Sequence, residues 1–309
     1  MGPTSPRVSV AVPVYNGERH LPAAVESVLG QTFTDFELVL CDNASTDCTE
    51  ELCRGYAARD KRVRYHRNPR NIGLSANFDL AAALCSARLV KWAASDDVLG
   101  PNCLADCVHL LDENPKVVLA VPAGRLIDAH GDPVPPPRDV LRPIVWPTDT
   151  VGRVRRFIDM LTTKESIAVM LYLYGVFRAE KLSGCLTLPR YPMSDQETLL
   201  AALLAGEFAE TERPSLAIRM HDESFGSGVH TDPARIWRSM HPDEPPPRPI
   251  GLWHHRRHRR ILSMLAGADL PMLDRGSLQA HYVYRVGRQL ALGKMEGARR
   301  RLQALRANR

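Results

Sequence analysis

The sequence predicts an α/β fold in which a mainly parallel sheet carries helices on both faces. Over the first hundred residues, short apolar runs rich in β-branched residues alternate with segments whose apolar residues recur at helical spacing. Polar residues end the apolar runs, and because parallel strands end at one edge of a sheet, these residues are expected to converge there. They are Tyr15, Asn16, Asp42, Asn43, Ser95, Asp96 and Asp97.

The elements of this first half follow one another at regular intervals. Each expected strand is an apolar run that stops at a turn-forming residue, and each expected helix has an apolar stripe or a capping serine or aspartate before it. The strands are expected at 8–14, 36–41, 63–66 and 89–94, and the helices at 18–29, 49–58 and 75–85.

The second half is less regular. A proline begins the helix expected at 101–113, where a missing N–H is tolerated, and Gly131-Asp132 predicts the turn of a hairpin over 125–134. The proline-rich stretches 133–147 and 241–249 are expected to be irregular. The other expected elements are strands at 116–123 and 215–220, an apolar buried segment at 168–178, and helices at 151–161, 195–204, 282–292 and 295–305.

Charge divides the 309-residue chain into an acidic body and a basic tail. From Gly251 to Arg309 there are 13 Lys and Arg against 3 Asp and Glu, which leaves 27 against 32 of the totals of 40 and 35 for the rest. The tail therefore carries +10 and the body −5. We expect the tail to pack on the body, with peripheral membrane contact, self-association or attraction of an anionic acceptor as alternatives. Its HHRRHRR run is expected to be a solvated basic face.

Several classes of protein are disfavoured by what the sequence lacks. No run approaches the roughly 20 apolar residues of a membrane helix, and the N-terminus lacks the pattern of a signal peptide. The seven cysteines are odd in number and scattered, which is typical of reduced thiols. A cytoplasmic protein is expected. No glycine-rich dinucleotide or phosphate-loop motif is present.

The adjacent carboxylates of Asp96 and Asp97 end a strand that is expected to be buried. Their repulsion calls for a cation or for several hydrogen-bond donors. Mg²⁺ or Mn²⁺ would meet this need and keep open positions for phosphate oxygens. An ordinary pair of capping residues at the start of a loop is the alternative.

The surrounding motifs resemble the family-2 glycosyltransferases. They are VSVAVPVYNGERHLPAAVESVLGQTFTDFELVLCDNASTD (8–47), NPRNIGLSANFDLA (68–81) and VKWAASDDVLGP (90–101), with weaker echoes up to about Ser227. The resemblance implies a Rossmann-like GT-A fold with a mixed, mainly parallel sheet. It places a glycosyltransferase domain at 1–228, with a nucleotide-binding half (1–123) and an acceptor half (124–228). A basic, mostly helical extension follows at 229–309.

The resemblance also implies roles for individual residues. Asp97 would bind the metal, and His221, after a strand, could approach the metal or diphosphate or be a plain surface histidine. Many relatives carry a further aspartate where this chain has Ala94, which leaves one carboxylate fewer. The residues expected to bind the nucleotide sugar are Pro13, Val14, Tyr15 (against the base), Asn16, Glu18, Asp42, Asn43, Asn77 and Asp96.

Direct displacement at an anomeric carbon also needs a base for the acceptor hydroxyl. Asp195 is the candidate because it opens a helix and matches the family's later acidic position; a routine helix cap is the alternative reading. Glu197 is the second candidate. Arg178 is expected either to meet the diphosphate or to close a buried strand.

These features predict an inverting, metal-dependent glycosyltransferase. Its donor would be a nucleotide-diphosphate sugar, and its acceptor a hydroxyl or amine of a natural product, a lipid-linked glycan or a polysaccharide. The alternatives are a nucleotidyltransferase of similar architecture, a non-catalytic nucleotide-sugar binder and a nucleic-acid binder. Nucleic-acid binding is not expected, because the body is acidic and the tail lacks interleaved aromatics.

Overall fold

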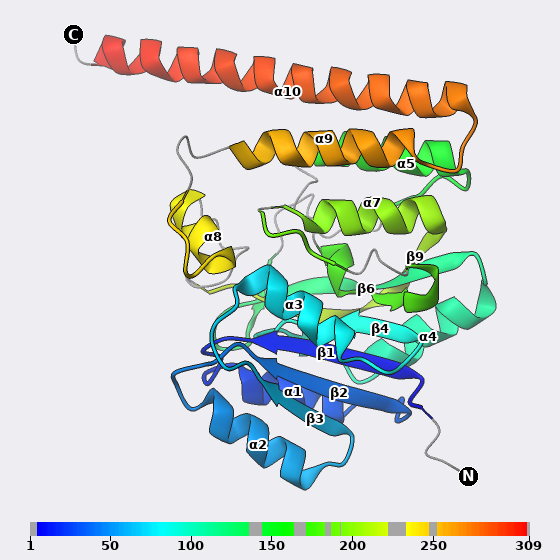
Figure 1. Ribbon diagram of the computed structural model, residues 1–309, viewed down its shortest axis with the longest axis vertical. Coiled ribbons are helices and arrows are strands. Elements are labelled where there is room, and N and C mark those ends of the chain that lie inside the picture. Colours follow the sequence, from blue (N-terminus) through cyan, green and yellow to red (C-terminus); the bar gives the residue numbers. More distant parts are fainter. Residues whose placement is uncertain are drawn as a thin grey trace.

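The computed structural model describes residues 5–135, 144–163, 171–182, 187–191, 193–221, 233–246 and 252–307. Within these residues, nine strands form one sheet in the order β3-β2-β1-β4-β8-β6-β9-β5, with β7 paired to β6 (Figure 1). The strands are β1 (Val8–Val14), β2 (Phe36–Asp42), β3 (Val63–Arg67), β4 (Leu89–Trp92), β5 (Val98–Leu99), β6 (Val117–Ile127), β7 (Pro133–Val134), β8 (Val176–Arg178) and β9 (Glu207–Arg219).

The parallel half of the sheet brings the polar strand ends together. All seven residues of β1 and all seven of β2 are buried, as expected for strands covered on both faces. Their register pairs Val14 with Asp42, so the loops after both strands leave the sheet at the same level. β4 stops level with Ala11, and residues 93–97 continue from it toward the same edge.

The second half of the sheet is mixed. β8 runs antiparallel to β4 and to β6, while β9 is parallel to β6. The short β5 pairs with the end of β9 through Val98 and Ala217. This pairing sets the acidic pair, which immediately precedes β5, beside the last residues of β9. The predicted hairpin after β6 is confirmed, since Leu126 pairs with Val134 across the turn.

Two apolar cores lie on opposite faces of the sheet, one under α1, α2 and α4, the other under α3, α5 and α7. Figure 1 shows α1 and α2 on the far side of the sheet from α7. The mixed, mainly parallel sheet expected from the sequence is therefore present. The helices are α1 (Leu21–Leu29), α2 (Thr49–Arg59), α3 (Leu74–Ala83), α4 (Cys103–Glu113), α5 (Thr150–Leu161), α7 (Asp195–Ala205), α8 (Pro233–Met240), α9 (Leu252–Ala266) and α10 (Met272–Ala307).

The basic extension packs on the body through two of its helices. Ile261 and Leu265 of α9, with Leu278 and Tyr282 of α10, belong to the same core as α5 and α7. Figure 1 shows α10 running across α9 and past its end. The two helices expected at 282–292 and 295–305 form one helix instead, because no proline separates them and an interior glycine costs only about 1 kcal/mol. Helix α9, which includes HHRRHRR, was not predicted.

None of the helices that the structure describes combines the length and apolar character of a membrane span.

The contact between α3 and α8 depends on Gly73, which precedes α3 with φ +89°. A Cβ there would lie 2.1 Å from the carbonyl oxygen of Met240, the last residue of α8. Gly73→Ala should lower the free energy of unfolding by at least roughly 1–3 kcal/mol, since strained backbone and a steric clash add. Urea unfolding followed by circular dichroism measures this change.

Gly55→Ala is the matched control: nothing lies within 4 Å of its Cβ position in α2, so this substitution should raise the free energy of unfolding by roughly 0.5–1 kcal/mol. Equal stability of both variants would contradict the packing of α8 against Gly73.

Candidate active site

The loops after β1 and β2 are tied together by side chains from the first loop. Asn16 Oδ1 accepts a hydrogen bond from the Thr46 amide (2.8 Å), and Glu18 Oε2 accepts one from the Cys48 amide (3.0 Å). In return, Ser45 Oγ accepts one from the Asn16 amide (2.9 Å). Tyr15 is left 49% exposed at the end of β1. Asn16 and Glu18 therefore shape the loops, and Tyr15 offers the open aromatic surface. Pro13 and Val14, which precede it, are buried.

Left-handed backbone marks three loops around this edge. Asn16 (φ +53°), Ala44 (φ +60°) and Met193 (φ +63°) are the non-glycine residues with positive φ in the described part of the chain. Asn16 follows β1, Ala44 follows β2, and Met193 precedes α7. Such conformations cost on the order of 1–3 kcal/mol each and concentrate at functional sites.

Asp42 lies beneath the loop edge and is 0% exposed. Its Oδ1 accepts from the Ser45 amide (2.8 Å), and its Oδ2 accepts from the Tyr65 hydroxyl (2.9 Å). Arg67 Nε lies 3.3 Å from the same Oδ2. Asp42 thus holds the 42–45 turn. For its carboxylate to accept a hydrogen bond from a nucleobase, one of these donors would have to move away.

Asn43 and Asn77 belong to a buried network of amide side chains. Asn68 donates to Oδ1 of Asn43 (3.1 Å) and to Oδ1 of Asn77 (2.9 Å). Asn43 donates to Asn71 (2.9 Å), and Asn77 donates to the carbonyl of Cys41 (2.9 Å). In this structure both residues therefore join the end of β2 to the start of α3, as a layer beneath the open surface.

The acidic pair meets the end of β9. The ring Nε2 of His221 lies 2.9 Å from Oδ2 of Asp96, and the Arg219 amide donates to Oδ1 of Asp97 (2.9 Å). The guanidinium of Arg219 donates to the Asp96 carbonyl (2.8 Å) rather than to a carboxylate. His20, at the start of α1, places its ring 5.0 Å from that of His221. Burial, and then the charge of Arg219, lower the pKa of His20.

A divalent cation fits the chemistry of these donors. Asp97 is 6% exposed, and burial followed by the adjacent Asp96 charge raises its pKa above the usual range. The protein alone therefore does not fully offset the negative charge of the ionised Asp97 carboxylate. Carboxylate oxygens suit Mn²⁺ or Mg²⁺. In the described residues, no three His, Cys, Asp or Glu side chains already form a metal cluster.

Tyr174 connects the acidic pair with the predicted base. It lies in the 3-10 turn Tyr172–Tyr174 just before β8. Burial raises the pKa of its hydroxyl, and the next largest causes are the charges of Asp97, Asp96 and Asp195. Three carboxylates from two separate parts of the sequence therefore act on one partly buried phenol. The buried Lys91 donates to the carbonyl of Tyr174 and holds the turn against β4.

Asp195 is the first residue of α7 and is 9% exposed. Its Oδ2 is buried and has no hydrogen-bond partner among the residues that the structure describes. Burial raises the pKa of its carboxyl to about 6. A carboxyl with a free oxygen and a pKa near neutrality is suited to accept a proton.

Glu197 and Arg178 are engaged elsewhere. Glu197 accepts from the Tyr191 hydroxyl and pairs with Arg260 (Nε to Oε2, 2.6 Å). Arg178 donates to the Val117 carbonyl (2.8 Å) and to that of Leu111. Arg178 closes a buried strand, which was one of its two expected roles.

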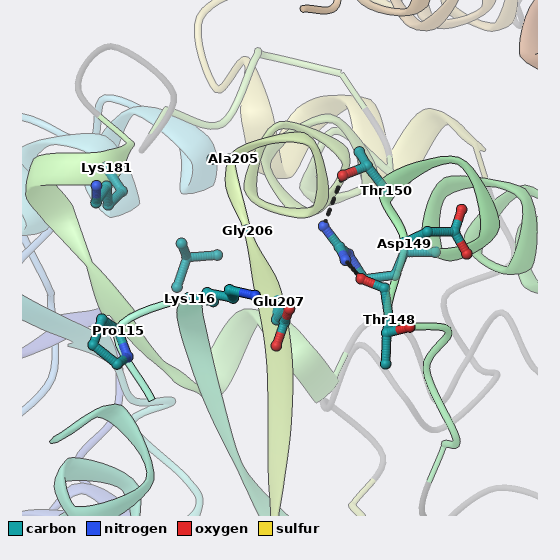
Figure 2. A pocket seen from close by; sticks show the side chains of 11 residues that line it. Pro115, Lys116, Thr148, Asp149, Thr150, Lys181, Ala205, Gly206 and Glu207 are labelled. Carbon is teal, nitrogen blue, oxygen red and sulfur yellow. Dashed lines mark hydrogen bonds between the residues drawn. The ribbon is translucent and has the colours of Figure 1, made fainter. Parts of the chain in front are cut away.

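A separate cavity of about 410 Å³ opens at the opposite edge of the sheet, where β6 and β9 begin. Figure 2 shows Lys116, Lys181 and Glu207 around it, with Thr150 from the start of α5. The dashed bond there joins the Arg153 guanidinium to the Thr150 hydroxyl (3.0 Å). Its walls include none of the residues predicted for the active site.

These features define the GT-A glycosyltransferase fold: a parallel half-sheet with polar loops and an acidic pair at its carboxyl edge, and a mixed second half. The chain belongs to the glycosyl transferase family 2, whose family model matches residues 9–182, more than half of its length.

Curated relatives match the N-terminal part of the chain. Chondroitin synthase of Escherichia coli is 32% identical over 127 residues, which are 41% of this chain and 18% of that protein. Glycosyltransferase GlyG of Streptococcus pneumoniae is 30% identical over 106 residues, which are 34% and 35% of the two chains. The matches thus span well under half the length of these relatives.

Solved structures show the same fold over most of the chain. TarS 1–349 of S. aureus superposes with a TM-score of 0.64 at 17% identity, covering 90% of this chain and 71% of that one. Its complex with UDP-GlcNAc gives 0.65 at 18% identity, covering 90% and 72%.

Three residues of this site were not singled out from the sequence. Arg219 stands two positions before His221, in one of the weaker family echoes. Tyr174 lies within another, LYGVFR (173–178), and His20 lies within the first glycosyltransferase motif (8–47). Only the folded chain shows that these residues lie near the acidic pair.

Proposed function

We propose that this protein transfers a sugar from a nucleoside-diphosphate sugar to a hydroxyl or amine acceptor, with inversion at the anomeric carbon. The observation that carries the proposal is that Asp96, Asp97 and Asp195 all lie close enough to the partly buried Tyr174 for their charges to raise the pKa of its hydroxyl. A site for a metal-bound diphosphate and a site for a base would thereby face one space. The acceptor would be a natural product, a lipid-linked glycan or a polysaccharide. A cytoplasmic location stays a prediction.

Each residue of the site would have a distinct task. Tyr15 lies against the nucleobase of the donor. The acceptor nucleophile gives its proton to Oδ2 of Asp195 as the oxygen or nitrogen of the acceptor bonds to the anomeric carbon. The bond from that carbon to the diphosphate oxygen breaks on the opposite side, which inverts the configuration. Asp97, with Asp96 and His221, would hold Mn²⁺ or Mg²⁺, which when bound offsets the negative charge of the leaving diphosphate.

A panel of nucleotide sugars, with and without Mn²⁺, tests this proposal. A donor that binds only the folded protein raises its stability, by about 2.7 kcal/mol at 100 times its dissociation constant. We expect one class of nucleotide sugar to raise the unfolding temperature, and Mn²⁺ to increase the effect. With an acceptor, nucleoside diphosphate should then be released. Release of pyrophosphate would instead favour a nucleotidyltransferase, and no stabilisation by any nucleotide sugar would overturn the proposal.

A further inference from the structure

The basic extension contacts the first turn of α7. Helix α9 packs beside α7, between α7 and α10 (Figure 1). Arg257 of α9 donates from Nη1 to the sulfur of Met193 (3.0 Å), and Arg260, three residues later, pairs with Glu197 (2.6 Å). Residues three apart share a helix face, so both arginines face the start of α7 from one side of α9.

Arg257 is placed to act on Asp195. Its side chain is partly buried, and its Nε has no hydrogen-bond partner among the described residues. Burial is the largest cause that lowers the pKa of Arg257, and the charge of Asp195 opposes that effect. Reciprocally, burial raises the pKa of Asp195, and hydrogen bonds from the backbone amides of Asp195 and Gln196, followed by the charge of Arg257, lower it.

The loop before Asp195 is also held by the extension. Met193 has a left-handed backbone (φ +63°) two residues before Asp195. Nε2 of His241, just after α8, lies 2.8 Å from the carbonyl of Arg190, and it must be the donor because the carbonyl only accepts. Before Asp195, the carbonyl of Arg190 is therefore held by His241, and the side chain of Met193 by Arg257.

We propose that Arg257 is a positioning residue of the active site, which fixes the loop before Asp195 and keeps the Asp195 carboxylate charged. The extension would thus be part of the catalytic machinery, although it lies outside the matched family region. The catalytic meaning of this role rests on the proposed function; the effect on Asp195 does not. In the described part of the chain, the charged side chain that acts on Asp195 is Arg257 from α9, and the charge of Asp195 in turn acts on Tyr174 in the turn before β8.

Carbon-13 NMR of protein labelled at aspartate Cγ tests this role without metal, donor or acceptor. The Asp195 resonance is assigned by its absence from Asp195→Asn. In the parent protein it should titrate near pH 6. Arg257→Met removes the positive charge but keeps the apolar stem, and we expect the midpoint to rise by about one pH unit or more. Arg257→Lys should restore most of the difference.

The matched control is Arg260→Met, one turn along the same face. Arg260 pairs with Glu197 and is not among the groups that set the ionisation of Asp195, so the Asp195 midpoint should stay in place. Should Arg257→Met fail to fold, Arg257→Gln gives the same comparison. An unchanged midpoint in either Arg257 variant, or an equal rise in Arg260→Met, would overturn the proposal. Because the titration uses the free protein, it can succeed even where the donor panel fails, and the reverse also holds.

Discussion

Asp195→Asn is expected to slow sugar transfer by about 10²–10⁴-fold while donor binding is unchanged. Asparagine keeps the size of the side chain but cannot take the proton of an acceptor hydroxyl at neutral pH. The free Oδ2 and the pKa of about 6 are the properties that this change removes. Transfer rates at saturating donor measure the first effect, and thermal stabilisation by the donor measures the second.

Glu197→Gln is the control, because Glu197 was the other candidate base. Its carboxylate is already engaged by Tyr191 and Arg260, so transfer should fall by less than about tenfold. A larger loss in Glu197→Gln than in Asp195→Asn would move the role of base to Glu197. Transfer by Asp195→Asn at close to the parent rate would remove Asp195 from the mechanism.

Asp97→Asn is expected to abolish the part of donor stabilisation that depends on Mn²⁺. The substituted amide would retain an oxygen to accept from the Arg219 amide, as Oδ1 of the carboxylate does now, so the local backbone should be preserved. The negative charge that attracts a divalent ion would be lost. Thermal unfolding with a nucleotide sugar, with and without Mn²⁺, measures the difference. A Mn²⁺ effect of unchanged size would show that Asp97 is not a ligand.

The same substitution should stabilise the metal-free protein at high pH. Folding raises the pKa of Asp97, so below its unfolded value near 4 the side chain is protonated in both states and costs nothing. Between the unfolded and the folded pKa, Asp97 is ionised in the unfolded chain but still protonated in the folded one, so the free energy of unfolding falls as pH rises across this window and levels off above the folded pKa. The advantage of Asp97→Asn should therefore grow from about pH 4 to pH 8. Asp269→Asn, at an exposed site on the extension, should show no such trend.

The parallel half of the fold could be predicted because its information is local. The apolar runs of β1 and β2 each end where the sequence changes to polar residues. Pairing that buries both runs in the same core places their polar ends at the same level of the sheet. The predicted edge therefore appears where Val14 pairs with Asp42. The boundary of α10 was less predictable, since tertiary packing through Leu278 and Tyr282 decides where an amphipathic helix begins.

Candidate residues for the site could be named from the sequence, but their surroundings could not. Asp97 and Asp195 stand out from the sequence and its family resemblance, yet nothing local reveals that Tyr174 lies near both. That relation depends on β8 pairing with β4, a contact between residues more than eighty positions apart. Arg257 was concealed for a similar reason, because a run of arginines and histidines reads as solvated surface until a partner helix is known.

The network of asparagine side chains between the end of β2 and the start of α3 has a consequence for how the affinity for a nucleotide would depend on pH. Its side chains carry no protons that titrate in the physiological range; they belong to Asn43, Asn68, Asn71 and Asn77. The layer beneath the expected nucleobase site should therefore keep its shape from mildly acidic to alkaline solution. The opposite end of the site relies on carboxylates. On acidification, a bound nucleotide should first lose its hold at the pyrophosphate, while the purine or pyrimidine ring remains seated.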